Sequence, residues 1–242
     1  MPKGRTANSP IAVLLIEGSP QIETDMAQSL ADTNGAYELQ VVHSLNDALT
    51  AVRKKQPTVV IFNIATIAGD TSDLVKQMRN ATSAFIYIVT ENSDTNTILQ
   101  GLEAGADDYH EPPVNCQHLV ARIYALLRRA SGALHLKNAL HFGHLEIRPD
   151  EGRVYRDGKE ISLTRTEFRL LCELATSPNK VFARETLLDR VWGYGYFGDG
   201  RLVDVHVRRL RTKIEVRPDN PEYVVTVRGL GYRFDGEKVK QH

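Results

Sequence analysis

Five short runs of β-branched and other apolar residues recur between residues 11 and 110, with helical patterns in the gaps between them. Runs of about four to eight such residues are typical of strands, and strands that alternate with helices form parallel sheets. We therefore predict a doubly wound sheet of five parallel strands, with its ligand site at the carboxyl ends of the strands. The predicted strands are Ile11–Ile16, Tyr37–His43, Thr58–Phe62, Ala84–Val89 and Ala106–Tyr109.

The pattern changes near residue 130, and 242 residues are enough for two domains of ordinary size. Hydrophobic residues make up 42% of the chain and charged residues 25%, which excludes a largely disordered or membrane-embedded protein. No apolar run approaches the roughly 20 residues of a spanning helix, so we expect no membrane partner. The predicted parts are a tail (1–10), the parallel-sheet domain (11–129), a linker (130–139), an α+β domain (140–236) and a second tail (237–242).

The net charge of zero hides an asymmetry between the two halves. Through residue 131 the chain has 10 Lys and Arg against 14 Asp and Glu, and the remainder has 20 against 16. An acidic half joined to a basic half favours a sensor linked to a nucleic-acid binder. The two cysteines, Cys116 and Cys172, have no metal-ligand spacing around them and predict neither a disulfide framework nor a metal site. We expect a reducing, cytoplasmic location.

The segment 201–214 (RLVDVHVRRLRTKI) has the pattern of an amphipathic helix. One stripe of its projection is apolar and must face a core. The opposite side has Arg201, Val205, Arg208 and Thr212, with Arg209 off centre. Guanidinium groups there suit guanine edges or phosphates in a major groove, and Val205 suits a thymine methyl group. His206 and Lys213 are predicted on the flank, near backbone phosphates.

Two strands follow this helix, joined by a glycine-rich turn that contains Arg228. A turn of this kind beside such a helix would place Arg228 against the adjacent minor groove. The alternative is that the basic helix face is only solvated and that Arg228 is an ordinary exposed turn residue.

Three segments give a specific resemblance: 163–171 (LTRTEFRLL), 201–211 (RLVDVHVRRLR) and 225–234 (VTVRGLGYRF). Together they resemble the winged helix-turn-helix effector domain of OmpR/PhoB-type response regulators. The resemblance implies DNA contacts at matching positions, and it implies that the loop 193–200 (GYGYFGDG) approaches RNA polymerase. The G-x-G-x-x-G spacing in that loop does not predict a dinucleotide site, because a helix rather than a strand precedes it. The implied DNA contacts are Arg201, His206, Arg208, Arg209, Arg211 and Arg228.

The first half resembles a receiver domain, most clearly in residues 101–109 (GLEAGADDY) and Pro113. Receivers of this family accept a phosphoryl group on an aspartate that follows the third strand. Here that position is Asn63, whose neutral amide is a poor nucleophile and adds no carboxylate charge for a metal. The other pocket positions are Glu17, Gly18, Thr90 and Pro112, of which Gly18 offers no metal ligand and Pro112 no cation. The pattern predicts a degenerate receiver with no aspartyl phosphorylation, no metal and no cofactor.

The resemblance also implies a homodimer through the face formed by the fourth helix, fifth strand and fifth helix. Asp108 and Arg122 match positions that pair across that interface, and Ile98 replaces a usual basic residue. Burial of Ile98 in the dimer would compensate for a lost surface ion pair; alternatively, Ile98 is a lone exposed apolar residue. The interface set is Ile98, Leu99, Leu102, Asp107, Asp108, Val120, Arg122 and Arg129.

These patterns predict a transcription regulator, not an enzyme, that binds double-stranded DNA as a dimer without phosphate. Two alternatives stay open. One is a switch that responds to a ligand, a partner or oxidation of Cys116 through the remodelled pocket. The other is a receiver that retains phosphoryl chemistry.

Overall fold

The computed structural model describes residues 10–16, 19–33, 36–64, 69–90, 95–110, 113–131, 139–193 and 200–236. The contacts between residues divide the chain into two compact units, Met1–Ile123 and Tyr124–His242. The division falls inside a helix, whereas the sequence places the domain boundaries at 129/130 and 139/140. Those boundaries stay predictions.

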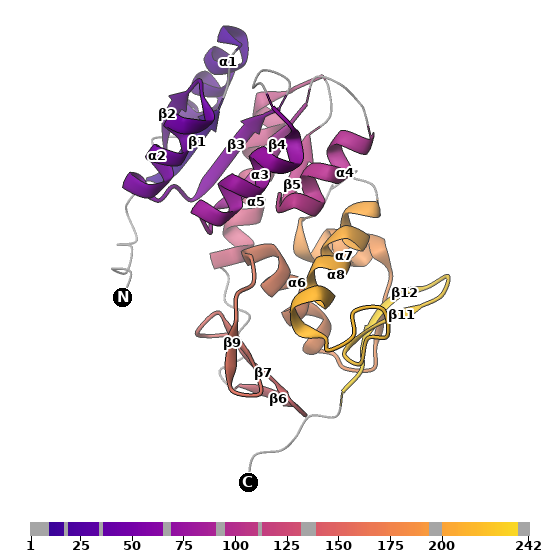
Figure 1. Ribbon diagram of the computed structural model, residues 1–242. Coiled ribbons are helices and arrows are strands. Elements are labelled where there is room, and N and C mark those ends of the chain that lie inside the picture. Colours follow the sequence, from indigo (N-terminus) through magenta and orange to yellow (C-terminus); the bar gives the residue numbers. More distant parts are fainter. Residues whose placement is uncertain are drawn as a thin grey trace. The chain divides into compact units, whose positions relative to one another are not determined.

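The first unit contains a five-stranded sheet with strand order β2-β1-β3-β4-β5, and every neighbouring pair is parallel. This arrangement confirms the predicted doubly wound fold, and Figure 1 shows the strands with helices flanking them. The strands are β1 (Ile11–Ile16), β2 (Tyr37–Val42), β3 (Val59–Asn63), β4 (Phe85–Val89) and β5 (Asp108–His110). The helices are α1 (Pro20–Ala31), α2 (Leu45–Lys55), α3 (Thr71–Ala81), α4 (Thr95–Ala104) and α5 (Cys116–Ser131), which runs past the unit's end.

Every residue of β3 and β4 is buried. Both strands are continuous apolar runs apart from Asn63, as expected for strands covered on both faces. Each of the five predicted runs overlaps an observed strand, with ends that differ by no more than two residues. The sheet core therefore follows from the local pattern of β-branched residues.

In its described residues the second unit combines two antiparallel sheets with three helices that follow the end of α5. The four-stranded sheet has the order β6-β7-β8-β9, and the three-stranded sheet has the order β10-β12-β11. The strands are β6 (Leu140–Phe142), β7 (Leu145–Arg148), β8 (Arg153–Arg156), β9 (Lys159–Ile161), β10 (Val181–Phe182), β11 (Val224–Val227) and β12 (Gly231–Phe234). The helices are α6 (Arg165–Ala175), α7 (Arg184–Val191) and α8 (Arg201–Ile214). This unit is the expected α+β winged helix.

Strand β10 is absent from the sequence prediction because two residues are too few to form a recognisable pattern. It pairs with β12 at the base of the hairpin formed by β11 and β12. Gly231 makes this approach possible: its φ is +133°, and a Cβ atom there would lie 2.1 Å from the carbonyl oxygen of Phe182. The hairpin base is thus held against the rest of the unit by backbone contact.

None of the helices in the described ranges has the length and apolar content that a membrane crossing requires.

Candidate nucleic-acid interface and receiver pocket

One side of α8 faces the core of the second unit. Val203, Val207, Leu210 and Ile214 are all buried, and they recur at the three- and four-residue spacing of one helix face. The helix therefore turns its other side outward. On that side Arg201, Arg208 and Thr212 are exposed, which is the arrangement that the helical projection predicts.

Strands β11 and β12 and the turn between them, residues 224–234, form a hairpin that we call the wing. Arg228 and Gly229 lie in its turn, and both are exposed. Gly229 has a φ of +76° with open space around its Cβ position, so the turn itself requires the glycine. The wing thus presents one guanidinium group at its tip.

Two residues of the predicted contact face are inside the unit instead. His206 is 0% exposed, and its ring meets that of Trp192 edge-on with the centroids 5.1 Å apart. Val205 is also buried. The prediction that these side chains reach a phosphate and a thymine methyl group is wrong for this conformation. His206 lies beside the buried stripe and extends it, whereas Val205 lies opposite the stripe and is buried on the outer side of α8.

Arg209 and Lys213 are turned toward α6 and bind the same carboxylate. A nitrogen of Arg209 lies 2.9 Å from Glu167 Oε1, and Lys213 Nζ lies 2.6 Å from Oε2. Glu167 is fully buried and also accepts a hydrogen bond from the backbone N–H of Thr164, in a capping box at the start of α6. Burial raises the pKa of Glu167, but the two cations outweigh burial and leave the pKa below its ordinary value. Arg209 and Lys213 therefore hold α8 on α6, and the DNA contacts predicted for them stay predictions.

Arg211 is also used within the unit. Its Nε donates to the carbonyl oxygen of Val224 over 2.7 Å, and a terminal nitrogen donates to Thr226 Oγ1 over 2.8 Å. On the helical projection Arg211 lies away from the groove-facing centre. Its guanidinium group joins α8 to β11 rather than pointing toward a groove.

Asn63 and Thr90 lie at the carboxyl ends of the neighbouring strands β3 and β4, and both side chains are buried. Ile64 donates its backbone N–H to the carbonyl oxygen of Val89, so the two strand ends are joined. Glu17, Gly18 and Pro112 lie outside the described residues. Within the described part of the chain, no group of three or more His, Cys, Asp or Glu side chains is placed to bind a metal.

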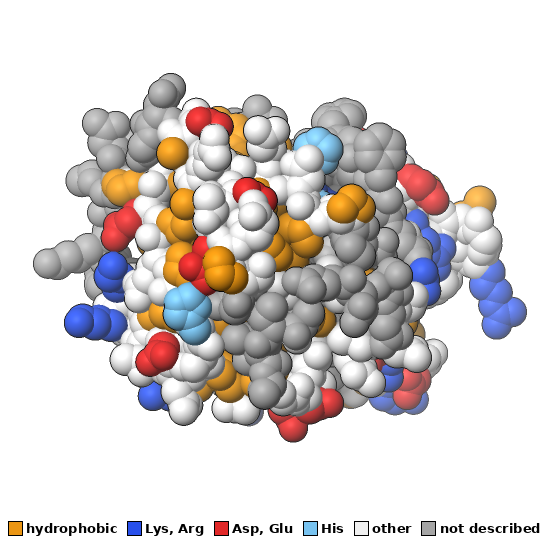
Figure 2. Space-filling view, turned by 90° about the horizontal axis from the view of Figure 1, so that it is seen from above, with side chains coloured by type: hydrophobic (Ala, Val, Ile, Leu, Met, Phe, Trp, Pro, Cys, Tyr) orange, Lys and Arg blue, Asp and Glu red, His pale blue; other side chains and the backbone are white. Residues whose placement is uncertain are grey.

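Figure 2 views the molecule from above. Among the coloured side chains, acidic, basic and hydrophobic ones are mixed, and the acidic ones are scattered rather than gathered.

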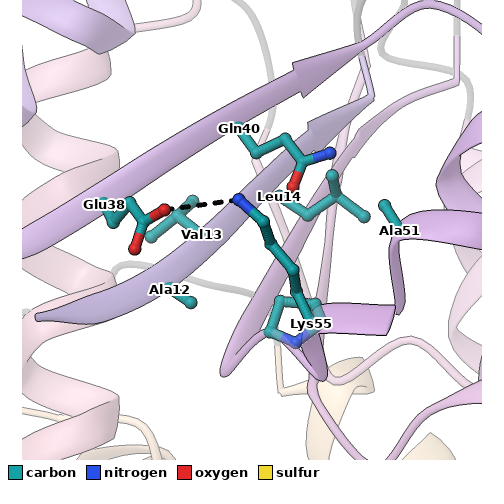
Figure 3. A pocket seen from close by; sticks show the side chains of 8 residues that line it. Ala12, Val13, Leu14, Glu38, Gln40, Ala51 and Lys55 are labelled. Atoms are coloured by element: carbon teal, nitrogen blue, oxygen red, sulfur yellow. Dashed lines mark hydrogen bonds and ion pairs between the residues drawn. The ribbon is translucent and has the colours of Figure 1, made fainter. Parts of the chain in front are cut away.

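A small hollow lies in the first unit between β1, β2 and α2, and Figure 3 shows the ion pair Glu38–Lys55 beside it. Its volume of about 10 Å³ suits a water molecule rather than a ligand.

The apolar residues predicted for the dimer face are mostly buried within the chain. Ile98, Gly101 and Leu102 form the buried stripe of α4, and Ile98 is 4% exposed. A Cβ atom at Gly101 would overlap the side chain of Ile88, which shows that this stripe lies on β4. Both predictions for Ile98, burial between two copies and lone exposure, are therefore wrong. Val120 is buried as well, and Leu99 keeps partial exposure.

Asp107 binds α3 within the same chain. Its Oδ2 lies 2.5 Å from a guanidinium nitrogen of Arg79 and accepts the backbone N–H of Ile86 over 3.0 Å. Arg79 also donates to the carbonyl oxygens of Gly105 and Ala84. With 2% exposure Asp107 is an internal anchor, so its predicted place in the dimer interface is wrong.

Asp108 and Arg122 are near each other within one chain, at 3.9 Å. Asp108 is buried, and its Oδ1 accepts the backbone N–H of Tyr109. Burial and the neighbouring Asp108 carboxylate raise the pKa of Tyr87 well above its ordinary value. Pairing of Asp108 across an interface therefore competes with a pair already present in the monomer. The side chain of Arg129 lies outside the described residues.

Comparison with known proteins identifies the family. Residues 13–124 match the model of the response regulator receiver domain, and residues 158–234 match that of the C-terminal domain of transcriptional regulatory proteins. The chain is 38% identical to the DNA-binding response regulator MtrA of Mycolicibacterium smegmatis over 221 residues, which cover 91% of this chain and 95% of MtrA. The chain belongs to the OmpR/PhoB family of response regulators.

A second relative of this OmpR/PhoB protein is the transcriptional regulatory protein ResD of Bacillus subtilis, 35% identical over 92% of this chain and 95% of ResD. Among solved structures, a mutant of RitR superposes with a TM-score of 0.72 at 27% identity, covering 93% of this chain and 99% of the RitR chain. The family resemblance and the two-domain fold predicted from the sequence are thereby confirmed.

Sequence reasoning missed the residues that connect the elements of this OmpR/PhoB effector unit. Glu167 had a readable signal, because Thr164-x-x-Glu167 has the spacing of a capping box. No sequence signal marked Arg184, Asp204 and Tyr232, since their partners lie on other elements.

Two other predicted features are only partly described or are buried. Of the loop 193–200, residues 194–199 lie outside the described residues. Cys116 is buried.

Proposed function

We propose that this protein is a sequence-specific transcription regulator that binds double-stranded DNA. The outer side of α8 enters the major groove, and the tip of the wing contacts the adjacent minor groove. The observation that carries the proposal is the exposed side of α8, on which Arg201, Arg208 and Thr212 recur opposite a fully buried stripe. Relatives with the same two domains are named DNA-binding response regulators.

The buried and ion-paired residues narrow the contact set. His206 is in the core, while Arg209 and Arg211 bind groups of the same unit. The proposed base- and phosphate-contacting residues are therefore Arg201, Arg208, Thr212 and Arg228. A guanidinium group suits guanine O6 and N7 in two parallel hydrogen bonds, which discriminate against a wrong base by about 1–3 kcal/mol.

Substitution of Arg208 tests this function directly. We expect Arg208→Ala to weaken binding to the selected DNA site by about 5- to 150-fold and to relax base preference at one position of each half-site. The measurement is fluorescence anisotropy combined with selection from a random duplex pool. Arg153→Ala is the matched control, because Arg153 is an exposed arginine of β8 in the same unit. A footprint unchanged by both Arg208→Ala and Arg228→Ala contradicts the function.

We further propose that DNA binding needs no aspartyl phosphorylation. The support is Asn63, a buried neutral amide at the end of β3, where the family has its acceptor aspartate. An amide does not form an acyl phosphate. Incubation with acetyl phosphate and Mg²⁺ should leave the intact mass and the DNA affinity unchanged, while a receiver with an intact aspartate is modified in parallel. A gain of one phosphoryl group contradicts the proposal and favours retained phosphoryl chemistry.

The proposed DNA-bound state is a homodimer that joins the faces formed by α4, β5 and α5. Leu99 and Arg122, which keep partial exposure on this face, support it. Dimers of this kind recognise half-sites about one helical turn apart, roughly 10 base pairs. Light scattering on the unmodified protein should give twice the chain mass at DNA-binding concentrations, and Leu99→Glu should lower it. RNA polymerase is the proposed second partner, through the loop 193–200.

A further inference from the structure

The ring of Tyr232, in β12, is in contact with two guanidinium groups. The guanidinium carbon of Arg184, at the start of α7, lies 5.1 Å from the ring centroid, and that of Arg211, on α8, lies 5.6 Å from it. Both distances fall within the range of cation–π contacts. Tyr232 is buried, so these contacts are shielded from water on most sides. One aromatic ring thus connects α7, α8 and the wing.

Asp204, on α8, completes the connection. Its Oδ1 accepts the hydroxyl of Tyr232 and the Nε–H of Arg184, each over 2.7 Å. Burial and this hydrogen bond raise the pKa of Tyr232 to about 12, so the hydroxyl stays protonated and donates at physiological pH. The charged acceptor strengthens both hydrogen bonds relative to neutral pairs.

Arg211 extends the connection to the other strand of the wing. Beside the Tyr232 ring it donates to Val224 and Thr226 of β11. We call Arg184, Asp204, Arg211 and Tyr232 the Tyr232 cluster. The cluster therefore attaches both strands of the wing to α8, on either side of the turn that contains Arg228.

We propose that the Tyr232 cluster sets the position of the wing relative to α8, so that Arg228 and Arg208 engage the two grooves of one DNA site together. This inference rests on the proposed DNA-binding function. A two-stranded hairpin alone is marginally stable, and β10 pairs with β12 over only two residues, so the side-chain contacts of the cluster add to that backbone contact. Positioning it before binding removes the entropic cost of ordering it on DNA. Tyr232 and its partners are positioning residues, because they act through Arg228.

Coupling between substitutions distinguishes positioning from a general structural role. If the cluster places the wing, loss of the Tyr232 ring should remove the contribution of Arg228 and leave that of Arg208 intact. If the cluster only stabilises the unit, the contributions of Arg228 and Arg208 persist together or weaken together. Double-mutant cycles measure this difference directly.

The experiment uses the full chain and a duplex containing the site that the wild-type protein selects. Arg228→Ala and Arg208→Ala are each combined with Tyr232→Leu. In the wild-type background we expect Arg228→Ala to cost about tenfold in affinity, and in the Tyr232→Leu background less than about twofold. Arg208→Ala should cost the same factor in both backgrounds. Hydroxyl-radical protection in the minor groove should be lost, while methylation protection of guanine N7 persists.

Two further variants keep the test decisive. Tyr232→Phe retains the ring that contacts the guanidinium groups and removes only the hydroxyl; it should restore part of the Arg228 contribution even if Tyr232→Leu folds poorly. Tyr223→Leu is the matched control, because Tyr223 is a half-buried tyrosine beside β11 whose ring stacks on Phe234. It should leave the Arg228 contribution at its full size.

The outcomes separate the inference from the function on which it rests. Equal costs of Arg228→Ala with Tyr232 present and absent, or the same loss of coupling in Tyr223→Leu, overturn the positioning role while DNA binding stands. Absence of preferred DNA binding by the wild-type chain overturns the function and the inference together.

Discussion

Helix α8 and strand β5 each place charged side chains beside a buried apolar core, but they use them differently. Across the fourteen residues of α8, the helix has room for a buried stripe, a flank that binds α6 and an outer side with Arg208 and Thr212. β5 has three residues; its first residue, Asp108, and Asp107 just before it are buried against partners of the same chain. In this protein α8 therefore keeps charged side chains that are accessible to a partner, whereas the charged side chains at the start of β5 pair within the chain.

Both regions nevertheless contain the same arrangement: a buried carboxylate that pairs with a cation and accepts a hydrogen bond from a backbone N–H. In the second unit Glu167 binds Arg209, Lys213 and the N–H of Thr164. In the first unit Asp107 binds Arg79 and the N–H of Ile86. Removal of one partner of such a pair leaves an uncompensated buried charge, which costs more than the pair itself contributes.

The largest expected effect is that of Glu167→Ala. The substitution leaves Arg209 and Lys213 without their shared acceptor and removes the capping box of α6, so we expect a loss of about 3–5 kcal/mol in the free energy of unfolding. Urea denaturation monitored by Trp192 fluorescence measures it, since Trp192 lies in the same unit. Glu160→Ala, an exposed carboxylate in β9, is the control and should cost under about 1 kcal/mol. Equal losses of stability for both variants would show that a buried carboxylate contributes no more to the free energy of unfolding than an exposed one.

Asp107→Ala should destabilise the first unit by about 3 kcal/mol, because Arg79 keeps its charge in a largely buried position. Thermal unfolding followed by circular dichroism tests this, with Asp73→Ala on the exposed side of α3 as the control. If the variant kept its stability but its solution mass was halved, Asp107 would act in the dimer interface and not as an internal anchor, and the difference between β5 and α8 would not hold.

Acidification should weaken the α6–α8 contact. The pKa of Glu167 is lowered in the folded protein, so its contribution to stability is full above the unfolded-state value near 4.5 and decreases as the pH falls through the folded-state pKa. The stability difference between wild type and Glu167→Gln, measured by urea denaturation from pH 7 to pH 3, should therefore be largest above pH 5 and smallest at pH 3. A difference that grows toward pH 3 would contradict the assignment.

The smallest expected effect is that of Lys55→Ala at the edge of the first unit. Lys55 Nζ lies 3.4 Å from Glu38 Oε1, and both side chains are more than half exposed. Exposed pairs of this kind contribute about 0.2–1 kcal/mol. We expect a loss in this range that disappears in 1 M salt, because salt screens exposed charges. A salt-independent loss as large as that of Asp107→Ala would show that solvent exposure does not determine how much each ion pair contributes to stability.

Local patterns were sufficient for most of the fold. The five strands of the first unit coincide with the predicted runs within two residues, since β-branched and apolar content acts over the length of one strand. Strand β10 was missed because its two residues pair with β12, far along the chain. The buried stripe of α8 was predicted correctly, while the burial of His206 beside that stripe and of Val205 opposite it was not predicted.

The sequence by itself determined where most strands and helices form, which side of α8 faces the core, and that Asn63 rather than an acid ends β3. Only the tertiary structure decided which charged residues stay accessible. Arg208 and Arg209 are adjacent and chemically identical, yet one is exposed and the other binds Glu167 on another helix. The reason is physical: helix and strand periodicity is a property of neighbouring residues, whereas ion pairing and desolvation depend on distances that exist only after the elements pack.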